Sequence, residues 1–223
     1  MSAKTLYAIH TGPVLVEVIK PLVKELLPGT SLVNIMDDGL LSEVREAGHL
    51  TTAVTRRLIG YGVLAASAGA SAILNCCSSV GEAAEMLARV VDIPVVRIDE
   101  AMAERAVESG SRIGVIATLA TTLDPTKQLI LRKAKLSGRN IEVKSYVADS
   151  AFDSLLSGDP QKHDALVNAV IDRAIDENEV VVLAQGSMAR LVAVRQDASN
   201  GRILTSPRTG VESLRKHLQM EHA

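Results

Sequence analysis

Two adjacent cysteines, Cys76 and Cys77, are the residues of this 223-residue chain whose setting points most clearly to chemistry. They follow an apolar run at 72–74, which predicts a short buried strand, and they precede small polar residues and a helical pattern. Ser79 and Glu82 have the spacing of a capping box, so we expect a helix to begin near Ser79. The backbone N–H groups at such a helix start would stabilise a thiolate and lower the pKa of Cys77.

Only one of the two thiols is expected to be free for chemistry, because neighbouring residues of a strand point to opposite faces. We assign this role to Cys77, since ligands bind at the carboxyl ends of parallel strands, and we assign Cys76 to packing. The alternative is that Cys77 is also a small buried residue, as free cysteines commonly are. A disulfide between adjacent cysteines would be strained and is not expected.

Composition favours a soluble α/β protein. Hydrophobic residues make up 47% of the chain, while three tyrosines and one phenylalanine are its only aromatic residues, so the core must be aliphatic. Few aromatic side chains and a net charge of −2 without a basic patch argue against nucleic-acid binding. We expect no membrane span, no signal peptide and no disulfide framework, and therefore a cytoplasmic location.

Short apolar runs alternate with longer helical patterns along the chain, which predicts an α/β fold with mostly parallel sheets. The expected strands are 5–9, 31–35, 72–75, 95–98, 112–117, 141–146, 180–184 and 202–205. The expected helices are 14–27, 53–68, 81–91, 100–108, 124–135, 163–176 and 210–219.

A weak internal repeat divides this pattern into two halves. Thr11 and Thr118 each follow a strand and lie 107 positions apart, while Cys77 and Gln185 lie 108 positions apart. We therefore predict two similar lobes with a cleft between them, the first formed by 1–98 plus 206–223 and the second by 99–205. The alternative is that any α/β protein repeats its strand-loop-helix unit.

Three short segments, taken in order, resemble the aspartate/glutamate/hydantoin racemase family. They are Cys-Ser-Ser at 77–79, Ala-Thr-Leu-Ala-Thr at 117–121 and His-Thr at 10–11, and the resemblance spans roughly 7–218. It implies two α/β lobes related by a pseudo-twofold axis, with the active site in the cleft between them. It also implies a small carboxylate substrate, no cofactor, no metal, and one cysteine from each lobe for proton transfer at the α-carbon.

The chain departs from the family pattern at the second cysteine. The corresponding segment reads Val-Leu-Ala-Gln-Gly-Ser-Met at 182–188, so Gln185 occupies the thiol's place. An amide does not exchange a proton near neutral pH. The resemblance also covers single-cysteine decarboxylases, in which one thiol is enough.

The resulting site prediction combines the strand-end residues of both lobes. His10 is a second titratable candidate, with a structural role as its alternative. For Asp37 and Asp38 we favour a solvated turn, and for Arg208 a substrate-anion contact and a surface role stay open. The predicted catalytic residues are Cys77, Gln185 and His10; the predicted substrate-binding residues are Thr11, Ser78, Ser79, Thr118, Thr121, Gly186 and Ser187.

We predict a cofactor-independent racemase, epimerase or isomerase that acts next to the carboxylate of a small acid, with Cys77 as acid and base. One alternative is a single-cysteine decarboxylase or carbon–carbon lyase of the same superfamily. Another is a protein that binds small carboxylates without turnover. A homo-oligomer is expected, and a dimer is favoured because dimers are the commonest symmetric assemblies.

Overall fold

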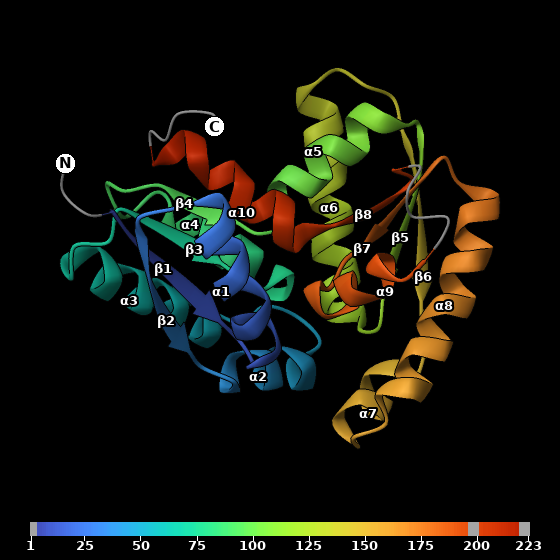
Figure 1. Ribbon diagram of the computed structural model, residues 1–223, viewed down its shortest axis with the longest axis horizontal. Helices are drawn as coiled ribbons and strands as arrows, with labels where there is room; N and C mark the ends of the chain where they lie inside the picture. Colours follow the sequence, from blue (N-terminus) through green and yellow to red (C-terminus); the bar gives the residue numbers. More distant parts are fainter. Residues whose placement is uncertain (1–3, 196–200, 219–223) are drawn as a thin grey trace. The chain divides into compact units, whose positions relative to one another are not determined.

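The computed structural model describes residues 4–195 and 201–218, and these form two compact units. Unit 1 contains the chain up to Glu100 together with the residues from Pro207 onward, and unit 2 is Ala101–Ser206. Each unit holds one four-stranded sheet whose strands are all parallel (Figure 1). The predicted α/β class with parallel sheets is confirmed. The first and last residues of the chain and 196–200, with position 219 of the last predicted helix, lie outside the described residues.

The sheet of unit 1 has the strand order β2-β1-β3-β4. Its strands are β1 (Lys4–His10), β2 (Thr30–Met36), β3 (Ala72–Asn75) and β4 (Val95–Arg97). Helices α1 (Val14–Leu26) and α10 (Ser206–His217) pack on one face of this sheet, over an aliphatic cluster that includes Leu6 and Cys76. Helices α2 (Gly39–Ala47), α3 (Thr52–Ser67) and α4 (Gly81–Leu87) pack on the other face.

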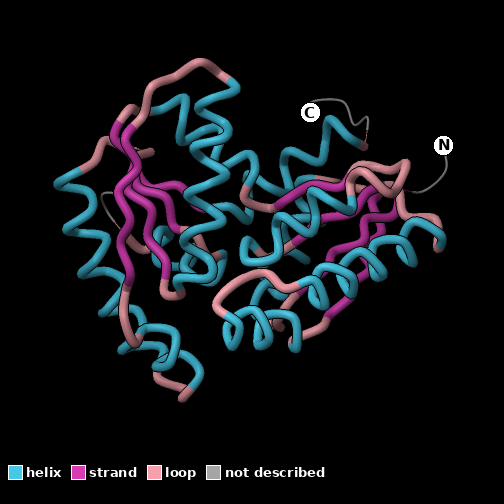
Figure 2. The backbone as a smooth tube through the Cα atoms, turned by 180° about the vertical axis from the view of Figure 1, so that it is seen from behind, coloured by secondary structure: helices cyan, strands magenta, loops and turns pink. Residues whose placement is uncertain are grey.

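Unit 2 repeats this topology with the strand order β6-β5-β7-β8. Its strands are β5 (Arg112–Ala117), β6 (Glu142–Val147), β7 (Val180–Leu183) and β8 (Ile203–Thr205). Helices α5 (Glu100–Ser109) and α6 (Ala120–Leu136) pack on one face, and α7 (Ala151–Leu156), α8 (Pro160–Glu177) and α9 (Ala189–Ala193) on the other. Figure 2 shows helices on both faces of the strands in each unit.

The strand register makes the repeat exact at the carboxyl ends of the central strands. Ile9 of β1 pairs with Asn75 of β3, and Ile116 of β5 pairs with Leu183 of β7. The next residue on each shorter strand donates its N–H to the central strand, Cys76 to the Ile9 carbonyl and Ala184 to the Ile116 carbonyl, at 2.9 Å in both units. The two strand-end loops therefore start from the same backbone geometry.

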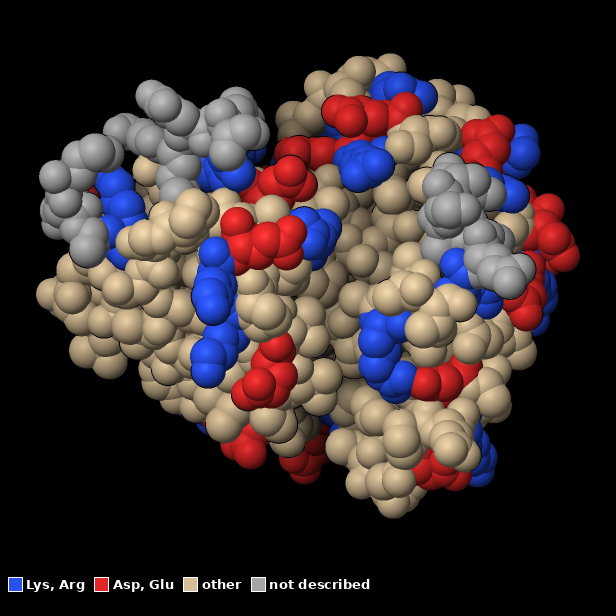
Figure 3. All heavy atoms as spheres, in the orientation of Figure 1, with Lys and Arg blue, Asp and Glu red and all other residues tan. Residues whose placement is uncertain are grey.

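The sequence missed α2, α7 and α9, which have between five and nine residues and are too short for a clear helical period. The predicted start of α6 at 124 was also wrong. Pro125 lies inside the helix, which begins at Ala120, so Thr121 belongs to its first turn. Charges of both signs are mixed on the face seen in Figure 3, in keeping with the small net charge.

Helices α3 and α4 touch closely at Gly62, where an added Cβ would lie 2.1 Å from Cδ2 and 2.8 Å from Cγ of the fully buried Leu87. We expect Gly62→Ala to lower the free energy of unfolding by about 1–3 kcal/mol, because the packed side chain must shift. Urea unfolding followed by circular dichroism measures this.

Gly60→Ala is the matched control, because Gly60 lies in the same helix with nothing within 4 Å of an added Cβ. It should stabilise the protein by about 0.5–1 kcal/mol, the ordinary helix preference of Ala over Gly. Equal and favourable effects of both substitutions would contradict the close contact.

Candidate functional site

Cys77 lies at the carboxyl end of β3, and its sulfur is surrounded by hydrogen-bond donors. The hydroxyl groups of Thr11 and Ser79 and the backbone N–H groups of Ser79 and Val80 all bond to it. Thr11 is the first residue after β1, while Ser79 and Val80 belong to the 3-10 turn Ser78–Val80 that directly follows the thiol. Adjacent strand ends and one tight turn thus bring four donors to a single sulfur atom.

The predicted lowering of the Cys77 pKa is wrong. Cys77 is only partly exposed, and burial raises the pKa of its thiol, while the hydrogen bonds from Thr11, Ser79 and Val80 act in the opposite direction without cancelling it. The predicted capping box is absent as well, because α4 begins at Gly81 without a side-chain cap. The hydroxyl of Ser79 donates to the sulfur instead of accepting from a helix N–H.

The backbone of the thiol is also held by a buried side chain. Asn75 donates from Nδ2 to the carbonyl of Cys77 at 2.9 Å, and its own Oδ1 is buried without a hydrogen-bond partner among the described residues. Asn75 is 1% exposed. A donor supplied by water or a ligand would satisfy this acceptor, since buried polar atoms are rarely left unpaired.

The sequence did not single out Arg97, whose guanidinium packs against Gly81, the residue directly after the turn that follows Cys77. Its guanidinium is 3% exposed and makes two hydrogen bonds to the fully buried carboxylate of Asp99, at 2.9 and 2.8 Å, and an ion pair with Glu85. Its Cζ lies only 2.3 Å from where a Cβ on Gly81 would be. Position 81 therefore needs glycine. The available sequence signal was an arginine that directly follows an apolar run and precedes an aspartate by two positions.

Unit 2 has the corresponding site, with an amide in place of the thiol. Gln185 follows β7 and is the residue before the 3-10 turn Gly186–Met188. Its Oε1 accepts two hydrogen bonds from Thr118, one from the backbone N–H at 2.6 Å and one from the hydroxyl at 2.9 Å. Thr118 is the first residue after β5, just as Thr11 is the first after β1.

The two sites are alike in their backbone and in one side-chain contact. Cys77 and Gln185 both have extended backbone angles, φ −142° and ψ 121° against φ −120° and ψ 130°, and both precede a 3-10 turn. In each unit, a strand-end threonine donates its hydroxyl to the side chain at this position. The structure thus brings Thr11 and Ser79 to Cys77, and Thr118 to Gln185.

His10 lies on the other face of its strand. Leu6 and Ala8 of β1 belong to the cluster beneath α1 and α10, whereas Ile9 belongs to the opposite cluster. Alternation assigns His10 to the face of Ala8, and Thr11 to the face of Ile9. The structure does not bring His10 to the thiol.

The surroundings of His10 are those of a core residue. It is 1% exposed, and its Nε2 donates to Oδ1 of Asn34 at 2.9 Å, while its Nδ1 is buried without a partner among the described residues. Burial lowers the pKa of His10, so the neutral imidazole is favoured. The residue at its position in unit 2 is Ala117, which is part of an apolar cluster.

The remaining predicted site residues differ in burial and in hydrogen bonding. Ser78 is buried, Gly186 and Ser187 are partly exposed, and the buried hydroxyl of Thr121 has no partner among the described residues. Arg208 forms an exposed pair with Glu25 through two contacts of 2.8 Å, which supports its surface role.

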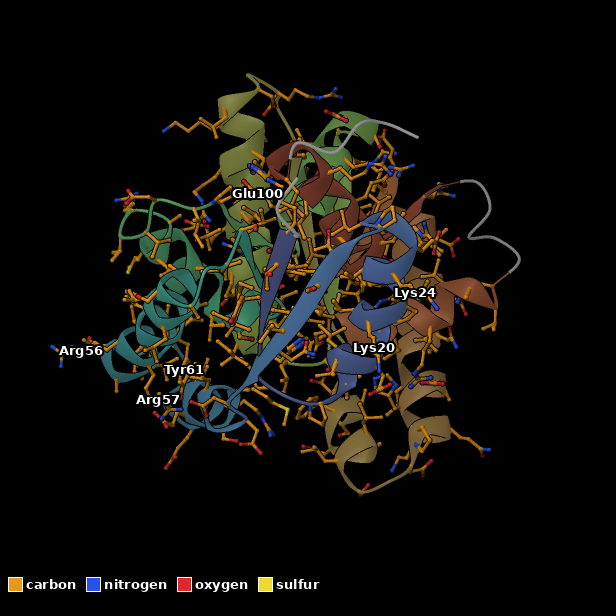
Figure 4. All side chains as sticks on the ribbon, turned by 60° about the vertical axis from the view of Figure 1, so that its left-hand side comes forward. Lys20, Lys24, Arg56, Arg57, Tyr61 and Glu100 are labelled. Atoms are coloured by element: carbon orange, nitrogen blue, oxygen red, sulfur yellow. The ribbon has the colours of Figure 1, made fainter. Side chains whose placement is uncertain are left out.

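The carboxylate of Asp37 is fixed by hydrogen bonds and an ion pair. It accepts from the Tyr61 hydroxyl at 2.7 Å and from the Gly39 N–H at 3.0 Å, and it pairs with Arg57. Figure 4 shows Arg57 and Tyr61 close together on α3. Asp37 is therefore not in a solvated turn, as we had favoured; its hydrogen bonds and ion pair connect the end of β2 to α2 and α3.

Two further properties concern metals and membranes. Within 4–195 and 201–218, no cluster of three or more His, Cys, Asp or Glu side chains could hold a metal ion. None of the helices in this described part is long and apolar enough to span a membrane.

The fold and sites define a protein of two repeated parallel α/β units, each with a threonine-bonded side chain at a strand end. The sequence profile described as Asp/Glu/Hydantoin racemase matches residues 11–214, and the chain belongs to this family. A search of curated proteins finds no match to the sequence.

Solved structures share the fold at low sequence identity. Aspartate racemase from Picrophilus torridus superposes with a TM-score of 0.76 at 13% identity, covering 99% of this chain and 96% of that one. Glutamate racemase from Francisella tularensis, solved with D-glutamate, gives 0.73 at 13%, covering 100% and 85%. Allantoin racemase from Klebsiella pneumoniae gives 0.66 at 15%, covering 99% and 94%.

The two thiols should differ in reactivity. Cys76 is 3% exposed and lies in an apolar cluster, whereas Cys77 is partly exposed, so iodoacetamide should label Cys77 first. Because burial raises the pKa of Cys77, its labelling rate should still climb with pH above the ordinary thiol range. Mass spectrometry of tryptic peptides after brief labelling measures both effects.

Thr11→Val should slow the labelling of Cys77 at a fixed pH, because it removes a donor to the thiolate, while Thr11→Ser should restore the rate. Equal labelling of the two cysteines, or a pH midpoint below the ordinary range, would contradict this description of the thiol.

Arg97→Met should lower the free energy of unfolding by about 3–5 kcal/mol, because it leaves the buried carboxylate of Asp99 unpaired. Arg208→Met is the control in the same unit, since its exposed pair with Glu25 should contribute less than about 1 kcal/mol. Urea unfolding measures both, and similar small losses would show that Asp99 does not depend on Arg97.

Proposed function

We propose that the protein is a cofactor-independent isomerase of the racemase type, in which Cys77 transfers a proton at the carbon next to the carboxylate of a small acid. The observation that carries this proposal is the set of four donors on the Cys77 sulfur at a parallel strand end. Family membership supports a racemase or isomerase activity in general. The named aspartate, glutamate and allantoin racemases share this fold.

The donors around Cys77 suit a thiol that alternates between two protonation states. Thr11, Ser79 and Val80 stabilise the thiolate, while burial favours the neutral thiol. When the thiolate removes the α-proton, the C–H bond breaks, the S–H bond forms, and the electron pair moves onto the carboxylate oxygens. Preorganised donors stabilise the resulting enediolate.

A single-cysteine decarboxylase or carbon–carbon lyase is the second candidate, and two observations favour it. Burial raises the pKa of Cys77, so the resting group is a proton donor, and such a reaction requires protonation of one face only. In unit 2 the corresponding side chain is the amide of Gln185, which cannot act as an acid or base near neutral pH.

The other expected properties remain part of the proposal. We expect a small carboxylate as ligand, no cofactor or metal, and a dimer in the cytoplasm. We keep Gln185 among the residues expected to contact the substrate, as the family resemblance implies. His10 is kept as a reserve acid/base only, since neither its strand face nor its neutral, buried ring supports a proton-transfer role.

Cys77→Ala should abolish proton exchange from any acid that the wild type accepts, a loss of ~10²–10⁴-fold. Gln185→Cys should create or raise racemisation, because it supplies a thiol at the equivalent strand end. NMR of amino acids, hydantoins, hydroxy acids and malonates in D2O follows exchange, and polarimetry and CO2 release follow the outcome.

The double variant Cys77→Ala, Gln185→Cys is the control, because it shows how much proton exchange the new thiol at position 185 supports without Cys77. Exchange retained in Cys77→Ala would overturn the role of Cys77. Tight acid binding that survives Cys77→Ala, in a wild type without exchange or CO2 release, would establish the binding protein instead.

A further inference from the structure

The orientation of the Gln185 amide is determined by its partner. Nitrogen and oxygen of a glutamine side chain are usually distinguished only by their hydrogen bonds. Here one bond comes from the backbone N–H of Thr118, which can only donate, so the atom that receives it must be Oε1. The Thr118 hydroxyl donates to the same oxygen at 2.9 Å.

The opposite atom of the amide is left for a ligand. Two acceptor positions of Oε1 are occupied, and no residue of the described chain accepts from Nε2. Gln185 is partly exposed, so these N–H groups face solvent rather than the core.

This arrangement can recognise only one kind of group. Nε2 donates and cannot accept, so it attracts an oxygen acceptor and repels an ammonium group or a further N–H. A donor held by two fixed hydrogen bonds loses little side-chain entropy when it binds a ligand. The hydrogen bond is strongest when the acceptor is charged.

We propose that Gln185 is a fixed hydrogen-bond donor to a carboxylate oxygen of the substrate, and that Thr118 is the residue that orients it. This inference rests on the proposed function, because it takes the ligand of Gln185 from the same class of small acids. The amide stabilises negative charge on the ligand oxygen and takes no part in proton transfer, since it is neither an acid nor a base near neutral pH. It should bind acids with a free carboxylate more tightly than the matching amides or esters, whose neutral carbonyl oxygens form weaker hydrogen bonds.

Ligand binding tests this without turnover when every arm also carries Cys77→Ser. The probes are malonate, succinate, L-aspartate and malonamide, which lacks a carboxylate, and calorimetry measures their affinity. At least one acid should bind, with malonamide at least ~10-fold weaker. Gln185→Met should lower the affinity for that acid by roughly 10–100-fold, as expected for a bond to a charged group.

Thr118 supplies the matched pair of orienting variants. Thr118→Val keeps the backbone donor but removes the hydroxyl, so affinity should fall by roughly 3–10-fold, while Thr118→Ser should restore it. Gln185→Glu keeps the size but presents a carboxylate to a carboxylate, and should bind more weakly than Gln185→Met.

Two results would overturn the inference: no acid binds to the Cys77→Ser protein, or acids bind equally to it with and without Gln185→Met. Neither result depends on the acid/base role of Cys77, which is judged by proton exchange in the Cys77→Ala protein. If the wild type shows no proton exchange but acids still bind in a Gln185-dependent way, the proposed enzyme activity is wrong and the proposed carboxylate site at Gln185 stands.

Discussion

Both sites depend on one kind of hydrogen bond. A threonine at the end of the central strand donates its hydroxyl to the side chain that follows the neighbouring strand. Thr11 bonds to Cys77 and Thr118 bonds to Gln185. Parallel pairing of β1 with β3, and of β5 with β7, brings these ends together without further elements. The same backbone therefore presents a thiol in unit 1 and an amide in unit 2.

Burial and hydrogen bonding act against each other at the thiol. Removing Cys77 from water raises its pKa, and the donors from Thr11 and the turn Ser78–Val80 limit that rise. The turn itself lies against the Arg97 guanidinium, which Asp99 and Glu85 hold in place. A buried ion pair is an uncertain source of stability, but it fixes geometry when both partners are satisfied. We regard this pair as the support of the donor turn.

The sequence predicted the fold well, because apolar runs in parallel strands are short, continuous and separated by helices. The spacing also singled out Thr11 with Cys77 and Thr118 with Gln185, two pairs that the structure joins by hydrogen bonds, while their functional roles stay predictions. It did not predict the sign of the Cys77 pKa shift, since that depends on burial by α2, α3 and α4 from distant parts of the chain.

Other errors came from contacts that local patterns do not contain. The capping box at Ser79 failed because its hydroxyl bonds to a sulfur two residues earlier. The role of His10 as an acid/base stays a prediction, which rested on residue type and strand-end position; the alternation of β1, which turns it toward the core, does not favour that role. Arg97 was overlooked because its importance lies in buried contacts with Asp99 and Gly81.

The central claim is that protons pass through one thiol only, because the equivalent residue of unit 2 is a fixed amide. The stereochemical course of deuterium exchange tests this most directly. An enantiopure acid that the wild type accepts is incubated in D2O, and deuterium content and optical purity are followed together by NMR and chiral chromatography. The account predicts deuterium uptake that is clearly faster than loss of optical purity, because unit 2 supplies no second thiol for the opposite face. Loss of optical purity at the rate of deuterium uptake would contradict it, since a second acid/base must then serve the opposite face.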